Sequence, residues 1–265
     1  MARVPNIPKN VSVDHIAEAV AGSRLWLGDN RILLQQIDNE SVDLVVTDPP
    51  YAISYRSNRR VAMPKFANIA LDDCIDWIPE FCKQMFRVLK PKTHIYCFCR
   101  WDTYPDFFSN LKEAGFTMKR TLIWVKDNHG SGDLRGDYAP QDEWIIFASK
   151  GRKNLMEPRI SNVIEVPRIA SIRLKHPTEK PVDLLKILID KSTYPRKFGE
   201  YEHEPEIVLD PFMGSGTTGV AATSLGHYFY GMEMNGEYFD VVQERLKEAI
   251  VQPDIQPERN GVPVS

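Results

Sequence analysis

The chain has 265 residues, of which 43% are hydrophobic and 26% charged, and this composition suits one large α/β domain. Its formal net charge of −3 gives no overall basic signature, so any contact with nucleic acid must come from local patches. No run approaches the ~18 apolar residues of a membrane span, and the first residues lack an apolar segment, which predicts a cytoplasmic protein. The four cysteines (Cys74, Cys82, Cys97 and Cys99) form no C-x-x-C pair, and we expect reduced thiols and no metal site.

The first part of the chain alternates helical and strand patterns. Residues 13–21 and 30–37 predict helices, and residues 24–28 and 43–47 predict strands. Asp29 ends the first strand. It either accepts a hydrogen bond from an adenine amino group or caps the helix that follows.

The tetrapeptide Asp48-Pro49-Pro50-Tyr51 directly follows the strand 43–47. Two consecutive prolines fit neither a central strand nor a helix interior, so we expect a stiff turn at the carboxyl end of a buried strand, where α/β sheets bind ligands. Asp48 offers an acceptor for an amino proton, a proline carbonyl can point into the site, and Tyr51 offers a flat face for a base. A rigid turn with a capping aspartate explains the tetrapeptide equally well when it is taken alone.

Residues 52–66 carry several basic side chains and no acidic one. This composition predicts a loop that contacts phosphate, with an ordinary solvated loop as the alternative. The arginines that we expect to contact DNA are Arg56, Arg59 and Arg60.

The middle of the chain predicts further elements of an α/β sheet. A long loop, 127–141, separates its last two strands, which should therefore pair as an antiparallel hairpin. The predicted helices are 75–89 and 104–114, and the predicted strands are 94–99, 118–125 and 142–148.

Residues 149–175 interrupt this alternation with a basic segment that has no strong period. We expect a small target-recognition insert that reads DNA, and the alternative is a solvated loop. Its candidate DNA-binding residues are Arg152, Lys153, Arg168 and Arg173.

The sequence His-Pro-Thr-Glu-Lys-Pro, residues 176–181, precedes a predicted helix at 182–190. Because Pro181 suits the first turn of a helix, Lys180 lies at its beginning. There it could hold an anionic group together with the free backbone N–H groups.

The last third of the chain has the pattern strand, glycine turn, helix, strand. The strand 207–210 leads into Asp-Pro-Phe-Met-Gly-Ser-Gly-Thr-Thr, and the next strand, 228–232, ends at Glu233. Glycines let a backbone approach a ligand closely, and an acid ~20 residues later is the ribose-binding position of nucleoside-binding folds. A terminal helix at 237–250 precedes residues 251–265, which we expect to be a disordered tail.

Together these three motifs resemble the β-group of S-adenosylmethionine-dependent DNA amino-methyltransferases, in which the catalytic half precedes the cofactor half. The resemblance spans residues 24–250. It implies a Rossmann-like, seven-stranded, mostly parallel sheet with helices on both faces, and the strands predicted above also number seven. We expect residues 1–250 to form a single methyltransferase domain.

The resemblance also implies roles for individual residues. Asp48, Pro49, Pro50 and Tyr51 correspond to the catalytic tetrapeptide, Glu233 to the ribose-binding acid, and Lys180 to a helix start near the cofactor carboxylate. The residues expected to bind S-adenosyl-L-methionine are Asp29, Lys180, Asp210, Pro211, Phe212, Gly214, Ser215, Gly216, Thr217, Thr218 and Glu233.

The implied reaction is methylation of N6 of a flipped adenine at a specific site in double-stranded DNA, without a metal. Relatives that act on N4 of cytosine usually carry serine at the position of Asp48, and carbon-5 methylation needs a Pro-Cys that this chain lacks. Methylation of RNA and a role as a non-catalytic partner subunit also stay open, and intact Asp48 and Tyr51 disfavour the latter. The resemblance allows a homodimer and a separately encoded restriction endonuclease as partners.

Overall fold

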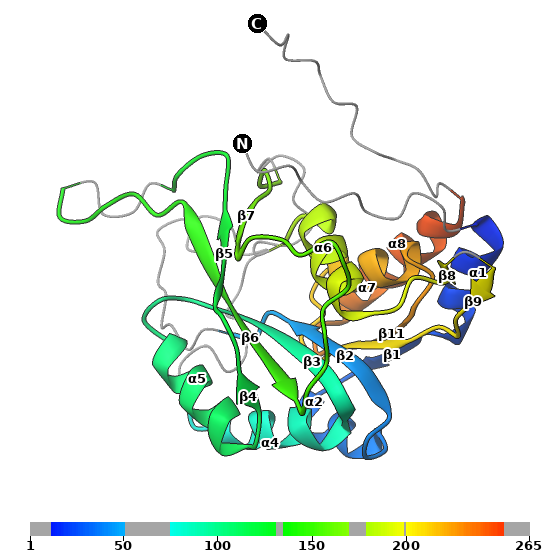
Figure 1. The fold of residues 1–265 in the computed structure, drawn as a ribbon, viewed down its shortest axis with the longest axis horizontal. Helices are drawn as coiled ribbons and strands as arrows, with labels where there is room; N and C mark the ends of the chain where they lie inside the picture. Colours follow the sequence, from blue (N-terminus) through cyan, green and yellow to red (C-terminus); the bar gives the residue numbers. More distant parts are fainter. Residues whose placement is uncertain (1–11, 51–74, 131–134, 170–178, 199, 252–265) are drawn as a thin grey trace, which may run out of the picture.

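Two layers of helices enclose a nine-stranded sheet in this computed structural model, which describes residues 12–50, 75–130, 135–169, 179–198 and 200–251 (Figure 1). The strands lie in the order β1-β11-β10-β2-β3-β6-β5-β7, and β4 pairs with β6. Their bounds are Arg24–Leu27 (β1), Val42–Thr47 (β2), Leu89–Cys99 (β3), Thr117–Met118 (β4), Leu122–Val125 (β5), Asp142–Lys150 (β6), Val163–Glu165 (β7), Ile207–Asp210 (β10) and Tyr228–Glu233 (β11).

The expected fold class is confirmed, because the sheet is mostly parallel. Among the described strands of this sheet, β6 alone runs against the others. The expected hairpin of 118–125 with 142–148 is also present.

The expected number of seven strands is wrong for two local reasons. The segment 118–125 forms two strands. Met118 and Leu122 are four positions apart, whereas their partners on β6 are three positions apart, and the extra residue interrupts the ladder. The basic segment 149–175 is not wholly irregular either, because it finishes β6 and then forms β7 beside β5. A strand of three residues is too short to give a period in the sequence.

Each face of the sheet is covered by its own set of helices (Figure 1). One hydrophobic core lies under α6, α7 and α8, with α1 packed beside them, and a second lies under α4 and α5 with the short α2. The bounds are Val13–Gly22 (α1), Asn30–Leu33 (α2), Ile78–Val88 (α4), Tyr104–Glu113 (α5), Val182–Ser192 (α6), Thr217–Ser224 (α7) and Gly236–Val251 (α8).

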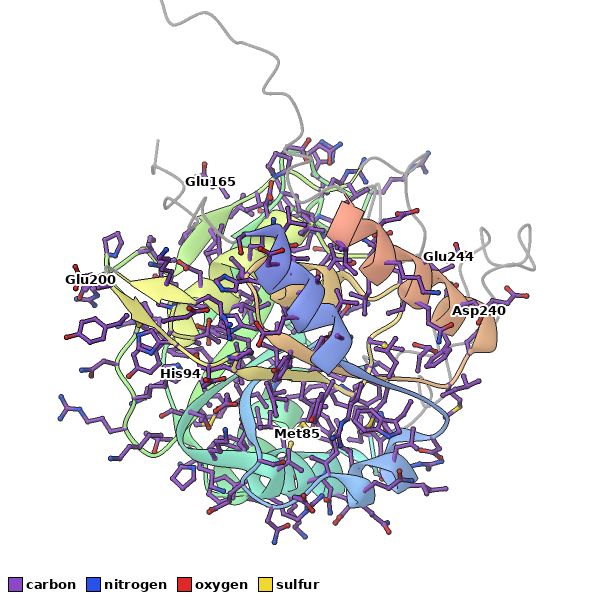
Figure 2. The ribbon with its side chains drawn as sticks, turned by 90° about the vertical axis from the view of Figure 1, so that its right-hand side faces the viewer. Met85, His94, Glu165, Glu200, Asp240 and Glu244 are labelled. Carbon is purple, nitrogen blue, oxygen red and sulfur yellow. The ribbon has the colours of Figure 1, made fainter. Side chains whose placement is uncertain are left out.

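The helices show the amphipathic pattern that this layering requires. On α8, Val242 and Leu246 are buried against the sheet side, whereas Asp240 and Glu244 point outward (Figure 2). Met85 of α4 is buried in the opposite core (Figure 2). None of the helices in the described ranges is long and apolar enough to cross a membrane.

The central strand β2 is buried on both faces, as its aliphatic sequence predicts. Leu44 and Val46 belong to the core under α6 and α7, and Val45 belongs to the core under α4. From β2 the chain passes through α4 to β3 on one side, whereas from β10 it passes through α7 to β11 on the other. The connections therefore diverge between β2 and β10, and α/β sheets bind ligands in the crevice at the carboxyl ends of the strands at such a switch point.

Two further boundaries differ from expectation. The helix expected at 75–89 begins at Ile78 and ends at Val88, before Lys90-Pro91-Lys92. The strand expected at 94–99 already begins at Leu89, because the irregular stretch around Lys92 (φ 62°) still follows the edge of β2. Beyond the main sheet, Lys197–Phe198 (β8) and Tyr201–Glu202 (β9) form a small hairpin.

Candidate active site

Asp48 lies at the carboxyl end of β2, at the switch point of the sheet. Its Oδ2 is 2.6 Å from Nζ of Lys180, which precedes α6. Pro49 and Pro50 continue the chain away from the strand, and Tyr51 lies outside the described residues. Residues 48–50 have no regular secondary structure, so the expected stiff turn, which includes Tyr51, stays a prediction.

Lys180 is expected near the cofactor carboxylate, but in the structure its ammonium contacts two carboxylates of the protein itself. Besides Asp48, it lies 3.1 Å from Oε2 of Glu143 on β6, and Glu143 is also 2.8 Å from Nζ of Lys126. Burial opposes the charge of Lys180, but Asp48 and Glu143 raise the pKa of its ammonium above the ordinary value. Burial likewise opposes ionisation of Glu143, yet Lys180 and Lys126 hold the pKa of Glu143 below its usual value.

Asp210 ends β10 beside Asp48 and is buried. Thr47 donates a hydrogen bond to its Oδ1 at 2.9 Å, and Thr218 donates to its Oδ2 at 2.7 Å. The backbone N–H of Phe212 also donates to Oδ1 at 3.1 Å. Burial nevertheless raises the pKa of Asp210 to about 7, against the effect of these donors. Asp210 therefore ties β2, the glycine turn and α7 together, and it favours a cation nearby.

The glycine turn needs its glycines for two separate reasons. Gly214 (φ 52°) and Gly216 (φ 77°) both have left-handed backbone, which side chains other than glycine rarely adopt. A Cβ on Gly216 would also lie 2.6 Å from Cγ1 of Val242 on α8. Gly216 caps α7, which begins at Thr217.

Glu233 closes the same crevice from β11. Its Oε2 accepts a hydrogen bond from the N–H of Gly214 at 3.0 Å, and its Oε1 accepts from the N–H of Asn235 at 2.8 Å. Burial raises the pKa of Glu233, and these backbone donors oppose that effect. Each oxygen keeps a further lone pair, so the carboxylate can still accept from ligand hydroxyls.

Asp29 lies next to Glu233, because Leu27 of β1 pairs with Glu233 in the parallel ladder. Its carboxylate caps α2 by accepting from the N–H of Arg31 at 2.9 Å, and it also binds the Arg31 guanidinium. Hydrogen bonds from that guanidinium lower the pKa of Asp29. Of the two expected roles, the helix cap is therefore confirmed, and the contact with an adenine remains a prediction.

The remaining residues of the turn are held by their neighbours. The carbonyl of Pro211 accepts from Nδ2 of Asn30 at 2.9 Å. The ring of Phe212 lies 5.5 Å, between centroids, from each of Trp77 and Phe81, with which it forms an aromatic wall on the α4 side. Ser215 is buried and is bound by an arginine of α8.

That arginine, Arg245, is a site residue that the sequence motifs do not predict. It donates to the carbonyl of Ser215 at 2.8 Å and to its hydroxyl at 3.0 Å, and it lies 2.8 Å from Oε1 of Glu179. Its place one turn after buried Val242, on the apolar stripe of α8, is a signal that could have been noticed. Glu143 is another, and its partner Lys180 is 37 positions further along the chain, so no local pattern points to it.

The predicted DNA-binding residues do not all lie together. Arg168 follows β7 and Asp48 follows β2, so both lie where the parallel strands of the sheet end. The N–H of Arg168 is bound to Asp127 at 3.0 Å. Arg152 and Lys153 lie at the opposite edge, because β6 is antiparallel and ends there, and Lys153 pairs with Glu206 at 3.5 Å. A pocket of about 500 Å³ at that edge is likewise remote from Asp48. Arg56, Arg59, Arg60 and Arg173 lie outside the described residues.

The three cysteines within the described ranges, Cys82, Cys97 and Cys99, are buried free thiols. The same ranges contain no group of three or more His, Cys, Asp or Glu side chains that could hold a metal ion.

A doubly wound sheet with a polar crevice at its switch point, bordered by a glycine turn, defines a class of nucleotide-cofactor enzymes. Residues 42–244 match the family described as DNA methylase (N6_N4_Mtase), and the chain belongs to this family. Its members are S-adenosylmethionine-dependent amino-methyltransferases, so the cofactor of this chain is S-adenosyl-L-methionine and its substrate class is DNA.

Individual relatives support this assignment. The chain is 32% identical to "Putative methylase YubD" of Escherichia coli (strain K12), covering 84% of this chain and 90% of that protein. It is 30% identical to "DNA adenine methyltransferase YhdJ" of the same organism, covering 84% and 82%.

Solved structures agree in fold. The M1.HpyAVI–SAM complex aligns with a TM-score of 0.62 at 25% identity, covering 84% of this chain and 98% of that one. The PvuII DNA methyltransferase, described as cytosine-N4-specific, aligns with a TM-score of 0.64 at 18% identity, covering 88% and 92%. At that identity the second match concerns the fold alone.

Proposed function

We propose that this methyltransferase acts on N6 of adenine in double-stranded DNA, with Asp48 as the hydrogen-bond acceptor for the amino group. The observation that carries the proposal is the paired carboxylate of Asp48 at the end of β2, next to the glycine turn that ends β10. The aspartate at this position favours adenine, since relatives acting on cytosine usually carry serine there. The similarity to a protein described as a DNA adenine methyltransferase supports the same choice.

The residues of the crevice fit S-adenosylmethionine. Gly214 and Gly216 allow the left-handed turn that exposes the backbone at the end of β10, where the methionine part of the cofactor would bind. Asp210 is a buried acid with a raised pKa of about 7, and the ammonium of the cofactor's methionine part would supply the cation that it favours. Glu233 retains lone pairs for the two ribose hydroxyls.

We assign the other predicted cofactor residues to supporting roles. Asp29 lies beside Glu233, where it can face the adenine part of the cofactor, and Phe212 offers an aromatic edge to the same crevice. When bound, S-adenosylmethionine supplies a methyl group activated by a sulfonium. Pro211, Ser215, Thr217 and Thr218 shape the turn and α7 around it.

The chain's own contribution to the reaction is to position the base. The lone pair of the adenine amino nitrogen is conjugated with the ring, so this nitrogen is a poor nucleophile. Hydrogen bonds to the carboxylate of Asp48 and to the carbonyl of Pro49 favour a more tetrahedral nitrogen, and an aligned approach supplies most of the rate enhancement. The base must leave the duplex, and stacking on Tyr51, worth ~1–3 kcal/mol, offsets part of that loss.

The test is nucleoside analysis of unmethylated duplex DNA after incubation with the protein and S-adenosylmethionine. N6-methyladenine should appear with the wild type and be absent with Asp48→Ala, and duplex DNA should compete better than RNA of the same sequence. If N4-methylcytosine appears instead, the choice of adenine is wrong, although the enzyme class stands.

A further inference from the structure

Asp48 is the first member of a row of four alternating charges, which continues through Lys180 and Glu143 to Lys126. Nζ of Lys180 lies 2.6 Å from Asp48 and 3.1 Å from Glu143, and Nζ of Lys126 lies 2.8 Å from the other oxygen of Glu143. These residues come from the end of β2, the start of α6, the start of β6 and the end of β5. Only 7% of the Lys180 side chain is exposed, and its ammonium also lies 5.2 Å from the ring centroid of Phe98.

Such an arrangement is costly if it serves stability alone. Taking charges out of water costs several kcal/mol per ion in effective terms, and well-packed apolar replacements are often as stable as buried ion pairs. Glu143 has a clear local effect, because it is the second carboxylate in contact with the Lys180 ammonium, at 3.1 Å. Lys180 is therefore fixed between two carboxylates and is directed at the residue that carries the proposed chemistry.

We propose, building on the function proposed above, that Lys180, held by Glu143, is a positioning residue that keeps Asp48 an oriented anion for the substrate amino group. It is not a ligand of the cofactor carboxylate. An ionised carboxylate only accepts hydrogen bonds, so it suits an amino group that must donate. A permanent cation at 2.6 Å also makes Asp48 a weak base, which fits an acceptor of a hydrogen bond better than an acceptor of the proton.

Other titratable groups also face Asp48 and affect its ionisation. Asp210 on β10 is the nearest acid on the cofactor side, and the thiols of Cys97 and Cys99 face it from β3. All three are neutral or negative, so none can replace Lys180 as the balancing cation. Removing the positive charge of Lys180 should therefore make Asp48 easier to protonate.

The first experiment needs no cofactor. In Lys180→Met, the carboxyl carbon of Asp48, followed by NMR and assigned with Asp48→Asn, should titrate at a higher pH than in the wild type. Glu143→Gln removes a nearby negative charge and should give no shift to higher pH, and Lys180→Arg, which keeps a cation beside Asp48, should restore most of the wild-type behaviour.

The second experiment separates catalysis from cofactor binding in the same variants. Lys180→Met should lower the rate of methyl transfer roughly 100-fold, because a misplaced acceptor costs about that much. The acid limb of its pH–rate profile should move to higher pH. The dissociation constant for S-adenosylmethionine, measured by calorimetry, should change less than about threefold.

Lys90→Met is the matched control. Lys90 pairs with Asp43 at 2.7 Å near the opposite edge of the sheet, and 42% of its side chain is exposed. This variant should leave the titration of Asp48, the rate and the cofactor affinity unchanged.

Two results would overturn the proposal. Weakening of S-adenosylmethionine binding by tenfold or more (~1.4 kcal/mol) in Lys180→Met, with an unchanged titration of Asp48, would make Lys180 a cofactor ligand. A lower rate without any shift in the titration or in the pH profile would make it a structural residue. If Lys180→Met does not fold, Lys180→Gln decides between the same outcomes. Failure of the adenine assignment would appear separately, as a different methylated base in the wild type.

Discussion

At the scale of single residues, the buried carboxyl group of Asp210 destabilises the folded, cofactor-free protein when it is ionised. This group is buried among hydroxyl and amide donors, and its pKa is raised to about 7 because burial outweighs them. Between its ordinary pKa of 3.8 and this raised value, the folded state binds a proton that the unfolded state releases. The free energy of unfolding of the cofactor-free protein therefore loses this contribution as the pH rises through about 4 to 7.

Asp210→Asn, which resembles the protonated acid, should remove this cost. We expect the variant to be more stable than the wild type by ~1–3 kcal/mol at about pH 8, below the ~4 kcal/mol ceiling that the pKa difference sets. The gap should close as the pH approaches 4, and urea unfolding at several pH values measures it. The same variant should bind S-adenosylmethionine more weakly. A wild type that is the more stable protein at alkaline pH would show that Asp210 carries no such cost.

At the scale of elements, α8 braces the glycine turn as well as covering the sheet. Arg245 reaches from α8 to the carbonyl of Ser215, and it also pairs with Glu179 just before α6. The turn between β10 and α7 is thus held by two helices that are distant in the sequence.

Arg245→Met should weaken cofactor binding about tenfold (~1.4 kcal/mol), because the turn loses its anchor while the apolar part of the side chain is kept. Lys247→Met on the exposed side of the same helix is the control and should bind like the wild type. Calorimetric titration with S-adenosylmethionine distinguishes them. Equal affinities in the two variants would mean that α8 only covers the sheet.

Local sequence was sufficient for some parts of the site and not for others. The positions of three site residues in the fold could be predicted, because each depends on its neighbours in the sequence. Asp48 precedes two prolines, Gly216 belongs to a glycine-rich turn, and Glu233 ends a strand. The partner of Lys180 could not be predicted, since its contact with Glu143 depends on β6 turning antiparallel beside β3. The division of 118–125 into β4 and β5 could not be predicted either, because it depends on the register in which this segment pairs with β6.

At the scale of the whole molecule, the direction of β6 decides which basic residues can reach the base. The strand β6 finishes at the end of the sheet opposite Asp48, so Arg152 lies there. Arg168 follows β7 at the end of the sheet that carries the site. Of these two arginines, Arg168 is therefore the one that a duplex bound over the crevice could contact.

Arg168→Gln should therefore weaken binding of duplex DNA more than Arg152→Gln does. If Arg168 contacts one phosphate, the slope of log affinity against log salt should fall by about 0.9 in that variant. Binding measured by fluorescence anisotropy at several salt concentrations tests this. The reverse order of the two variants would mean that DNA approaches the other edge.

The division of the crevice into a cofactor side and a base side is tested most directly by the dissociation constant for S-adenosylmethionine in two variants, Asp48→Ala and Glu233→Ala. Asp48→Ala should bind the cofactor within about threefold of the wild type, although it transfers no methyl group, whereas Glu233→Ala should bind at least ~10-fold more weakly. Equal loss of affinity in both variants, or wild-type affinity in Glu233→Ala, would contradict that division.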